Sequence, residues 1–241
     1  MANSLYSKLS KVCHSFYRLY FPHEKIALII DKYLNEHNCK KIVFVGGLVH
    51  VAKLLQEKGY EITFVDYTEE MISEARKLIS NVKFVVSDMR ELNLNEKQDA
   101  VVLIGRILTY MYTDEDVKKT LTAFKNNLNK GGIILMDNYE TGKIDVGNYF
   151  NGTVEVKENN HIIRRISSMT KKQESPALFN WDCVYEEEIN GDKRLYEDKN
   201  HILRAFSKEE MKNLIEELNL EFIENATNFE KKSFITVARK L

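Results

Sequence analysis

The amino-acid sequence predicts an α/β protein built on a parallel β-sheet. Three short apolar runs, rich in β-branched and aromatic residues, are typical of buried strands and lie at 42–45, 62–65 and 82–86. Amphipathic segments that begin at Val49 and at Thr68 separate the runs and have the pattern of helices. Because strands that alternate with helices at this spacing pair in parallel through right-handed crossovers, we expect them to share one sheet.

The composition of the chain disfavours several classes of protein. Its 241 residues, 44% of them hydrophobic, suffice for one α/β domain with an insertion or for two small domains. A net charge of -1 predicts no nucleic-acid-binding or membrane-binding surface. Cys13, Cys39 and Cys183 lack metal-site spacing and cannot all pair, so we expect neither a disulfide framework nor a metal site. We expect a cytoplasmic protein, since no targeting segment is evident and the apolar run 26–30 is too short to span a membrane.

The N-terminal part predicts two helical segments ahead of the first strand. The segment 4–21 carries aromatic residues, including Tyr17 and Tyr20, at a spacing typical of one apolar helix face. Pro22 interrupts this pattern, and a helix follows at 23–37. We expect that helix to pack on the sheet.

Small and acidic residues follow the first three predicted strands. Gly46-Gly47 follow the first, Asp66 the second and Asp88 the third. Because ligands of such sheets bind beyond the carboxyl ends of the strands, we expect these residues to converge on one ligand. A carboxylate placed like Asp66 accepts hydrogen bonds from two ribose hydroxyls, and Asp88 suits the exocyclic amine of adenine. The sequence therefore predicts a ligand that contains adenosine.

The fourth predicted strand, 100–104, leads into the segment 105–111, which borders the ligand by topology. Arg106 in this segment could bind a carboxylate of cofactor or substrate, or could be a surface arginine paired with a helix acid. Tyr110 could reach the site or lie in the core.

A helix and the fifth strand come next. Thr113 is a typical N-cap for a helix at 114–128, whose first turn is acidic. The strand 133–137 follows, and Asn138 and Tyr139 at its carboxyl end are candidates to face a substrate.

The pattern changes to alternating polar and apolar residues between 154 and 203, which predicts an antiparallel sheet of three or four strands. A capping box beginning at Ser207 then opens a helix at 207–218. Two further strands, 221–224 and 233–239, complete a seven-stranded main sheet with an antiparallel edge.

Four motifs occur in order along the chain: Val65-Asp66-Tyr67-Thr68-Glu69-Glu70-Met71, Ser87-Asp88-Met89-Arg90-Glu91-Leu92, Gln98-Asp99-Ala100-Val101-Val102 and Leu128-Asn129-Lys130-Gly131-Gly132-Ile133-Ile134-Leu135. In this order and spacing the chain resembles class I S-adenosylmethionine-dependent methyltransferases of the small-molecule branch, especially amino-sugar N-methyltransferases. The resemblance covers nearly the whole chain. It implies a Rossmann-like seven-stranded sheet with an antiparallel β insertion. Accordingly, we expect residues 1–140 to form an N-terminal lid helix and the nucleotide-binding core, 141–205 the insertion that roofs the substrate, and 206–241 the rest of the core.

The resemblance implies S-adenosyl-L-methionine as the cofactor and no metal. The expected cofactor-binding residues are Tyr20, Val45, Gly46, Gly47, Asp66, Tyr67, Met71, Ser87, Asp88, Met89, Arg90, Ile104 and Gly105. Those expected to act on the acceptor are His201, Tyr17 and Arg106.

Three histidines are further candidates. An amine acceptor must lose a proton before it attacks, and His201 or His161, both on insertion strands, could accept that proton or could be purely structural. His50 lies beside the glycine turn, so we expect it near the cofactor rather than near the acceptor.

The glycine motif departs from the family pattern, in which an acid precedes three glycines. Here the sequence reads Phe44-Val45-Gly46-Gly47-Leu48-Val49-His50, so Phe44 replaces the acid and one glycine is missing. A shorter loop can still direct backbone N–H groups at a ligand. Alternatively, the chain is a non-catalytic or altered-cofactor member of the fold.

The sequence therefore leaves three functions open. The first is transfer of a methyl group to N or O of a small molecule by a monomer or homodimer. The second, methylation of a macromolecule, is disfavoured by the near-neutral charge and by Ile104-Gly105-Arg106-Ile107, which replaces the Asp/Asn-Pro-Pro-Tyr signature of nucleobase methyltransferases. The third is a binding or partner-activating protein without catalysis. A dehydrogenase is disfavoured because Gly-x-Gly-x-x-Gly is absent from the sequence.

Overall fold

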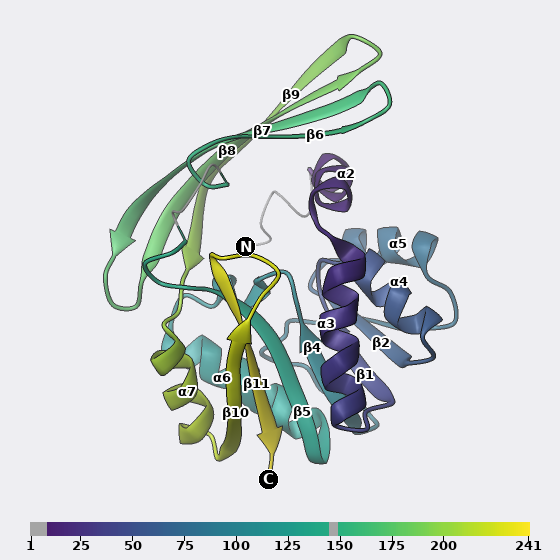
Figure 1. Cartoon of the computed structure of the whole chain (residues 1–241), viewed down its shortest axis with the longest axis vertical. Helices are drawn as coiled ribbons and strands as arrows, with labels where there is room; N and C mark the ends of the chain where they lie inside the picture. Colours follow the sequence, from purple (N-terminus) through teal and green to yellow (C-terminus); the bar gives the residue numbers. More distant parts are fainter. Residues whose placement is uncertain (1–8, 145–148) are drawn as a thin grey trace.

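The computed structural model describes residues 9–144 and 149–241, which form two β-sheets flanked by helices (Figure 1). The aromatic segment predicted at 4–21 begins outside the described residues, and its second half forms helix α2 (Ser10–Tyr20). The larger sheet lies in the lower body of the molecule as drawn, and the smaller sheet lies above it.

The larger sheet has the seven strands that the sequence predicts, in the order β10-β11-β5-β4-β1-β2-β3. Its strands are β1 (Lys41–Val45), β2 (Glu61–Asp66), β3 (Lys83–Val86), β4 (Gln98–Leu103), β5 (Leu128–Tyr139), β10 (Leu220–Thr227) and β11 (Ser233–Lys240). Strands β1 to β5 pair in parallel, whereas β11 pairs antiparallel with both β5 and β10. The order therefore places the carboxyl ends of β1, β2 and β4 side by side.

Strand β5 begins earlier than the sequence predicts. Pairing with β4 starts at Leu128 and slips between Gln98 and Ala100, so the glycine pair that was expected to precede the strand lies inside it. At Gly132 a Cβ atom would lie 2.9 Å from the carbonyl oxygen of Asp99. A side chain at this irregularity would clash with the neighbouring strand, which explains the glycine.

Helices cover both faces of the larger sheet. They are α3 (His23–Glu36), α4 (Val49–Glu57), α5 (Glu69–Leu78), α6 (Asp114–Asn127) and α7 (Lys208–Glu217), with a short 3₁₀ helix η1 (Ile107–Tyr110). The N-caps predicted at Thr68 and Thr113 are confirmed, and Ser207 begins a complete capping box with Glu210. Two apolar clusters form the core, one under α3, α4 and α5 and the other under α6 and α7.

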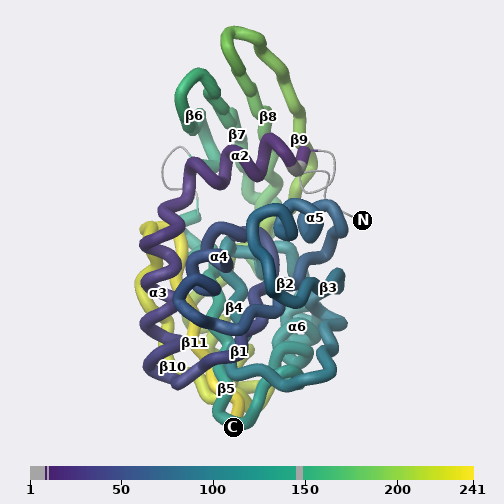
Figure 2. Tube along the Cα trace, turned by 90° about the vertical axis from the view of Figure 1, so that its right-hand side faces the viewer, coloured from purple at the N-terminus to yellow at the C-terminus, as the bar shows by residue number. Residues whose placement is uncertain are grey.

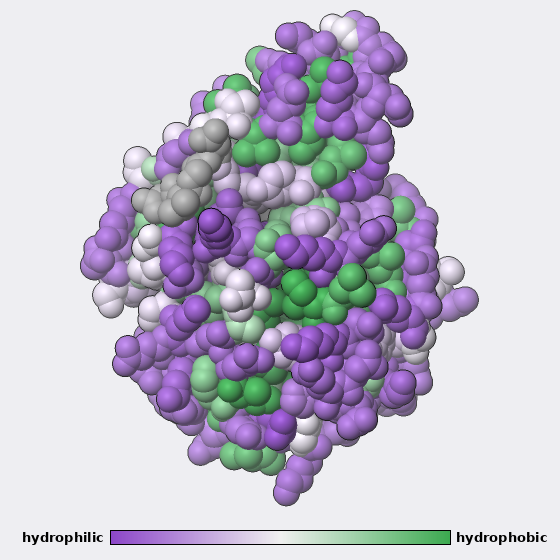
Figure 3. Space-filling view, viewed as in Figure 1, coloured by the Kyte–Doolittle hydropathy of each residue, from purple (hydrophilic) through white to green (hydrophobic). Residues whose placement is uncertain are grey.

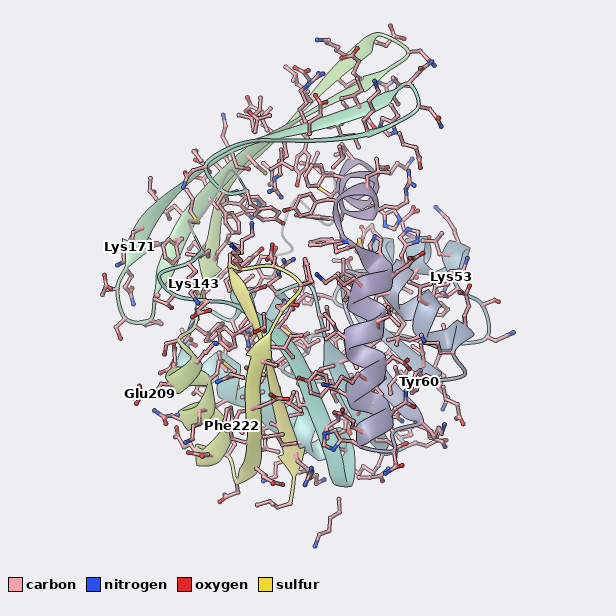
Figure 4. All side chains as sticks on the ribbon, viewed as in Figure 1. Lys53, Tyr60, Lys143, Lys171, Glu209 and Phe222 are labelled. Atoms are coloured by element: carbon pink, nitrogen blue, oxygen red, sulfur yellow. The ribbon has the colours of Figure 1, made fainter. Side chains whose placement is uncertain are left out.

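The smaller sheet is antiparallel, with four strands in the order β6-β7-β8-β9. They are β6 (Gly152–Glu158), β7 (His161–Gln173), β8 (Leu178–Ile189) and β9 (Asp192–Arg204), so the sheet lies between β5 and α7 in the sequence. Strand β7 continues past its apolar alternation into the polar residues 170–173, whereas β8 begins at the buried Leu178 and Phe179. Figure 4 shows Lys171 at the periphery of this sheet.

Helix α2 lies between the two sheets (Figure 2). Val12, Cys13 and Phe16 of α2 pack in a third apolar cluster with the inner face of the antiparallel sheet. Apolar side chains are visible beneath that sheet next to α2, whereas its outer tips are hydrophilic (Figure 3). The helix and the sheet thus form one roof above the carboxyl ends of β1, β2 and β4.

Candidate active site

A cavity of about 370 Å³ lies between the larger sheet and the roof. This volume is within the range of small-molecule sites. The lower wall comes from the strand ends and the loops that follow them, and includes Val45, Gly46, Gly47, Asp66, Tyr67, Met71, Ser87, Asp88, Met89, Arg90 and Gly105. The upper wall is largely aromatic and includes Tyr17, Tyr139, Tyr149, Phe150 and Trp181. The cavity therefore has a polar end beside the sheet and an aromatic end under the roof.

The glycine turn at the end of β1 is closely packed. Gly46 and Gly47 have φ angles of 71° and 39°, and a Cβ on Gly46 would lie 2.3 Å from Cδ1 of Ile107. Ile107 belongs to η1, so the short turn lets the loop after β4 approach the end of β1. Glycine is required at residue 46 both for the backbone angle and for this contact.

Phe44 does not enter the cavity. Its side chain is fully buried and stacks on Phe64, with 5.9 Å between ring centroids, in the cluster under α3 and α4. Leu48 lines the cavity without filling it. The residue that replaces the family's acid therefore contributes to the core rather than blocking the site.

Asp66 lies at the end of β2, and its side chain contacts Thr68, the N-cap of α5. Its Oδ1 accepts hydrogen bonds from the backbone N–H of Thr68 at 3.0 Å and from the Thr68 hydroxyl at 3.2 Å. Oδ2 faces the glycine turn, 3.8 Å from the position of a Cβ on Gly46. Burial raises the pKa of Asp66 to about 6 despite the hydrogen bonds from Thr68. A carboxylate fixed in this way could accept hydrogen bonds from vicinal hydroxyl groups.

Asp88 lines the same cavity but is held by its neighbour Arg90. Its Oδ1 accepts from Nε of Arg90 at 3.0 Å and its Oδ2 accepts from Nη2 at 2.6 Å, and hydrogen bonding to this guanidinium lowers the pKa of Asp88. Arg90 also donates to Asp116 at the start of α6. The Asp88 carboxylate is therefore ionised. Because the backbone N–H of Arg90 also donates to Oδ1 at 2.9 Å, one lone pair on Oδ2 is available to an amine donor.

Arg106 lines the cavity, yet its charge is matched within the protein. Its guanidinium is ion-paired with Glu230 and lies 3.6 Å from Oδ2 of Asp137. The rings of Phe21 and Phe229 flank it at 4.9 and 4.7 Å. Its side chain is 1% exposed. Arg106 is therefore a buried arginine of the cavity wall that is already paired with acids of the protein. The sequence suggested either an arginine free to bind a ligand carboxylate or a surface arginine, and the structure shows neither.

Three other predicted residues do not line the cavity. The ring of Tyr20 stacks on Phe16 with 5.6 Å between centroids, and Ile104 is buried in the core under α3. Nε2 of His201 on β9 lies against Oδ1 of Asp198, and its ring lies behind Trp181, with ring centroids 5.8 Å apart.

Of the remaining candidate site residues, some line the cavity and others lie elsewhere in the protein. Tyr110 and Tyr139 line the cavity, whereas Asn138 is buried and donates to the Thr236 hydroxyl at 3.3 Å. His161 pairs with Glu187 at 2.9 Å on the antiparallel sheet.

His50 lines the cavity together with two histidines that the sequence did not single out. The ring of His50 lies 5.5 Å from that of His14 on α2 and 5.1 Å from that of His23 on α3. Burial lowers the pKa of each, that of His50 to about 4. Three neutral imidazoles therefore join α2, α3 and α4 at this edge of the cavity. In the described ranges, 9–144 and 149–241, no group of three or more His, Cys, Asp or Glu side chains has a metal-binding arrangement.

Two aromatic residues of the upper wall, Tyr149 and Phe150, were also missed by the sequence reasoning. They lie between β5 and β6, outside any periodic pattern, and their rings are 4.7 Å apart. Only the folded chain brings them over the strand ends, so no local signal identifies them.

The sequence from residue 45 to residue 132 matches a family model described as a methyltransferase domain. The glycine/sarcosine N-methyltransferase of Aphanothece halophytica is 31% identical over 119 residues, which cover 45% of this chain and 44% of that protein. The dTDP-3-amino-3,4,6-trideoxy-alpha-D-glucopyranose N,N-dimethyltransferase of Streptomyces venezuelae is 26% identical over 95 residues, 39% of this chain and 40% of that protein. The chain thus spans roughly two fifths of the length of the relatives it matches.

Solved structures match over far more of the chain. DesVI from Streptomyces venezuelae superposes with a TM-score of 0.86 at 16% identity, covering 97% of this chain and 98% of that one. CalS10, an amino pentose methyltransferase from Micromonospora echinaspora solved with S-adenosylmethionine bound, gives a TM-score of 0.81 at 16% identity, covering 95% and 97%. The fold is therefore that of class I methyltransferases. Within it, residues 45–132 are the part that matches the family model.

Proposed function

We propose that this protein transfers a methyl group from S-adenosylmethionine to a nitrogen or oxygen atom of a small molecule, with an amine as the favoured acceptor. The observation that carries the proposal is one cavity that joins a fixed carboxylate, Asp66, and a glycine turn to an aromatic roof. The relatives named above are N-methyltransferases, which supports nitrogen as the acceptor atom.

The residues around the polar end fit the cofactor. Asp66 would accept hydrogen bonds from the ribose hydroxyls, and the backbone of Gly46 and Gly47, which has no Cβ, would approach the ligand closely. Asp88 would accept from the adenine amine through the one lone pair of Oδ2 that Arg90 leaves available. When bound, S-adenosylmethionine supplies an electrophilic methyl group on a sulfonium centre.

The residues around the aromatic end would orient the acceptor and exclude water. A methyl transfer of this kind depends mainly on alignment of the nucleophile, so little covalent machinery is needed. Tyr17 from α2, and Tyr149 and Trp181 under the antiparallel sheet, enclose the space next to the polar end. In this proposal, residues 1–140 and 206–241 hold the cofactor and residues 141–205 form the roof over the acceptor.

A further part of the proposal is the cellular location of the protein. A cytoplasmic location is supported by Cys13, Cys39 and Cys183, which are buried free thiols. No helix in the described part of the chain is both long and apolar enough to cross a membrane.

A transfer assay tests the proposal. Purified protein is incubated with methyl-labelled S-adenosylmethionine and a panel of small amines, alcohols and amino sugars, and labelled products are identified by mass spectrometry. We expect label on a nitrogen of at least one amine, and transfer that falls at least about tenfold in Tyr149→Ala, because loss of wall contacts disturbs alignment. Label found only on alcohols would contradict nitrogen as the favoured atom.

A second candidate is a protein of this fold that binds the cofactor without using it. The shortened glycine turn and the position of His201 behind Trp181, away from the cavity, favour this reading. Cofactor binding by calorimetry together with no transfer to any acceptor in the panel would support it.

A further inference from the structure

Three imidazoles form the wall of the cavity beside the glycine turn. His14, His23 and His50 come from α2, α3 and α4, are half-buried, and all line the cavity. Figure 2 shows α2 above α4, with α3 beside them. The ring of His50 is adjacent to both of the others, with centroids 5.5 Å from that of His14 and 5.1 Å from that of His23. The proposed function so far gives these side chains no role.

The strand order places this wall at the methionine end of the cofactor. In the larger sheet β1 lies between β4 and β2, and β3 follows β2 at the edge. With adenine at Asp88 after β3 and the ribose at Asp66 after β2, the rest of the cofactor would extend over the end of β1. His50 lies in the first turn of α4, directly after the glycine turn. The methionine part, which carries an ammonium and a carboxylate group, would therefore lie next to the imidazoles.

The acids of the cavity are all engaged elsewhere. The residue that replaces the family's acid, Phe44, lies in the core. Among the described residues, the acids that line the cavity are Asp66, Asp88 and Asp116. Asp66 would accept from the ribose, and the other two are ion-paired with Arg90. A desolvated ammonium group is costly to bury without an acceptor, so a different kind of side chain has to supply one.

The imidazole wall contains acceptor atoms without a donor. Nδ1 of His23 and Nε2 of His50 are buried and have no hydrogen-bond partner. Nε2 of His23 lies 3.0 Å from the carbonyl oxygen of Arg18. Because a carbonyl oxygen can only accept, this nitrogen carries the proton, and Nδ1 of the same ring carries a lone pair. Buried polar atoms are rarely left unpaired, so a donor from a bound molecule would satisfy this lone pair.

The charge of the wall also suits a cation. Burial lowers the pKa of all three histidines, so their rings are uncharged near pH 7 and do not repel an ammonium group. The cationic side chains that act on these rings are each matched by an acid, in the pairs Arg18 with Glu158, Lys53 with Glu57 and Lys77 with Glu74.

We propose that His23 and His50 bind the α-ammonium group of the cofactor, so that in this chain neutral imidazoles rather than an acid hold the methionine end. This inference rests on the proposed function, because it assigns residues to one part of that cofactor. A rotation of the half-buried His50 ring, a common adjustment on binding, would turn Nε2 into the cavity. Hydrogen bonds from a charged donor are stronger than those between neutral groups, which favours such a contact.

Three ligands isolate the ammonium group. The whole chain is titrated by calorimetry with S-adenosylhomocysteine, with the analogue that has hydrogen in place of its α-amino group, and with 5′-methylthioadenosine, which lacks the amino-acid part. We expect the analogue without the amino group to bind at least about tenfold more weakly than S-adenosylhomocysteine, because charge-assisted hydrogen bonds are lost. Equal affinity for these two ligands would overturn the inference.

Histidine-to-phenylalanine variants keep a ring and remove its nitrogen atoms. In His50→Phe and in His23→Phe we expect affinity for S-adenosylhomocysteine to fall at least about tenfold, with affinity for the two ligands without the amino group within about threefold of the wild type. His37→Phe, at the C-cap of α3 and away from the cavity, is the matched control and should bind all three ligands as the wild type does. A uniform loss for all three ligands in His50→Phe and His23→Phe would mean that the rings are only structural, and would contradict the inference.

Binding of 5′-methylthioadenosine keeps the two proposals apart. Its binding to the wild-type protein supports an adenosine site, and its binding to the variants shows that they are folded. If the wild-type protein binds neither this ligand nor S-adenosylhomocysteine at millimolar concentration, the proposed function is contradicted and the inference with it. Binding of both ligands without any preference for the amino group would contradict only the inference about His23 and His50.

Discussion

Gly46 and Ile107 lie so close that the glycine turn depends on both. Gly46→Ala would strain a backbone with a φ of 71° and place its Cβ 2.3 Å from Cδ1 of Ile107. We expect a loss of about 2–4 kcal/mol in the free energy of unfolding, measured by urea denaturation, because strain and overpacking add. Gly59→Ala is the matched control, since it has a φ of 95° with no atom within 4 Å of its Cβ. A loss equal to that of Gly59→Ala would show that the contact with Ile107 costs nothing.

The pKa of Asp66 predicts how cofactor affinity depends on pH. Burial raises this pKa to about 6, so the carboxylate is mostly ionised at pH 7.5 and mostly protonated at pH 5. Because the ionised form is the better acceptor for ribose hydroxyls, affinity for S-adenosylmethionine should fall as the pH drops through 6. Calorimetry from pH 5 to pH 8 measures this. Asp66→Asn should lack the transition, and the same transition in that variant would assign it to another group.

Single residues also mark how far the sequence could predict the site. Topology alone brought Gly46, Asp66 and Asp88 to one cavity, because consecutive parallel strands end at the same edge. The pairing of Arg106 with Glu230 joins residues 124 positions apart, and no local pattern encodes it. Sequence patterns placed residues on elements but could not show which charges are already matched.

Helix α2 and the antiparallel sheet are held together by the ring of Phe16. This ring is fully buried, stacks on Tyr20 and meets the edge of Tyr185 at 5.6 Å between centroids. Phe16→Ala should cost about 3–5 kcal/mol in the free energy of unfolding, the usual loss for a core phenylalanine. Leu28→Ala, at a side chain that is 59% exposed, is the control and should change it by less than about 0.5 kcal/mol. Similar losses in both variants would mean that α2 is not packed as described.

The histidines that join α2, α3 and α4 predict a loss of stability in acid. Burial lowers the pKa values of His14 and His23, and lowers that of His50 to about 4. Between pH 6.5 and about 4 the unfolded chain therefore binds more protons than the folded one, so the free energy of unfolding falls as the pH decreases.

Thermal melts across this pH range measure the effect. His50→Gln should flatten the dependence of the melting temperature on pH. An unchanged slope in His50→Gln would remove this cluster as the cause.

At the level of helices and strands, the sequence predicted most of the fold. Period-two and helical patterns identified the strands of both sheets, and capping residues fixed the starts of α5, α6 and α7. Strand bounds were predicted less well, because β5 begins at Leu128, before the glycine pair, and β7 continues into the polar residues 170–173. How the antiparallel sheet lies on α2 depends on packing between distant segments, and no local signal carries that information.

The molecule as a whole places a nucleotide-type site and an aromatic roof on opposite sides of one cavity. The larger sheet supplies fixed polar groups at its strand ends, and the roof supplies large apolar side chains with a buried cation behind them. In the proposed function, the strand ends bind the cofactor and the roof covers the acceptor. If the proposed function holds, substitutions under the roof should impair transfer while leaving cofactor affinity intact. Substitutions at the strand ends should weaken cofactor affinity and, at limiting cofactor, transfer as well.

Calorimetric titration of S-adenosylmethionine into wild-type protein and Asp66→Ala at pH 7.5 tests the central claim most directly. The account predicts one binding site in the wild-type protein, and an affinity lower by roughly 30-fold or more in the variant, since about 2–3 kcal/mol of hydrogen bonding to a charged acceptor is lost. The control is Asp31→Asn, which changes an acid of α3 that pairs with Lys58. This variant should bind the cofactor as the wild-type protein does. No binding to the wild-type protein at millimolar cofactor, or equal affinity in Asp66→Ala, would contradict it.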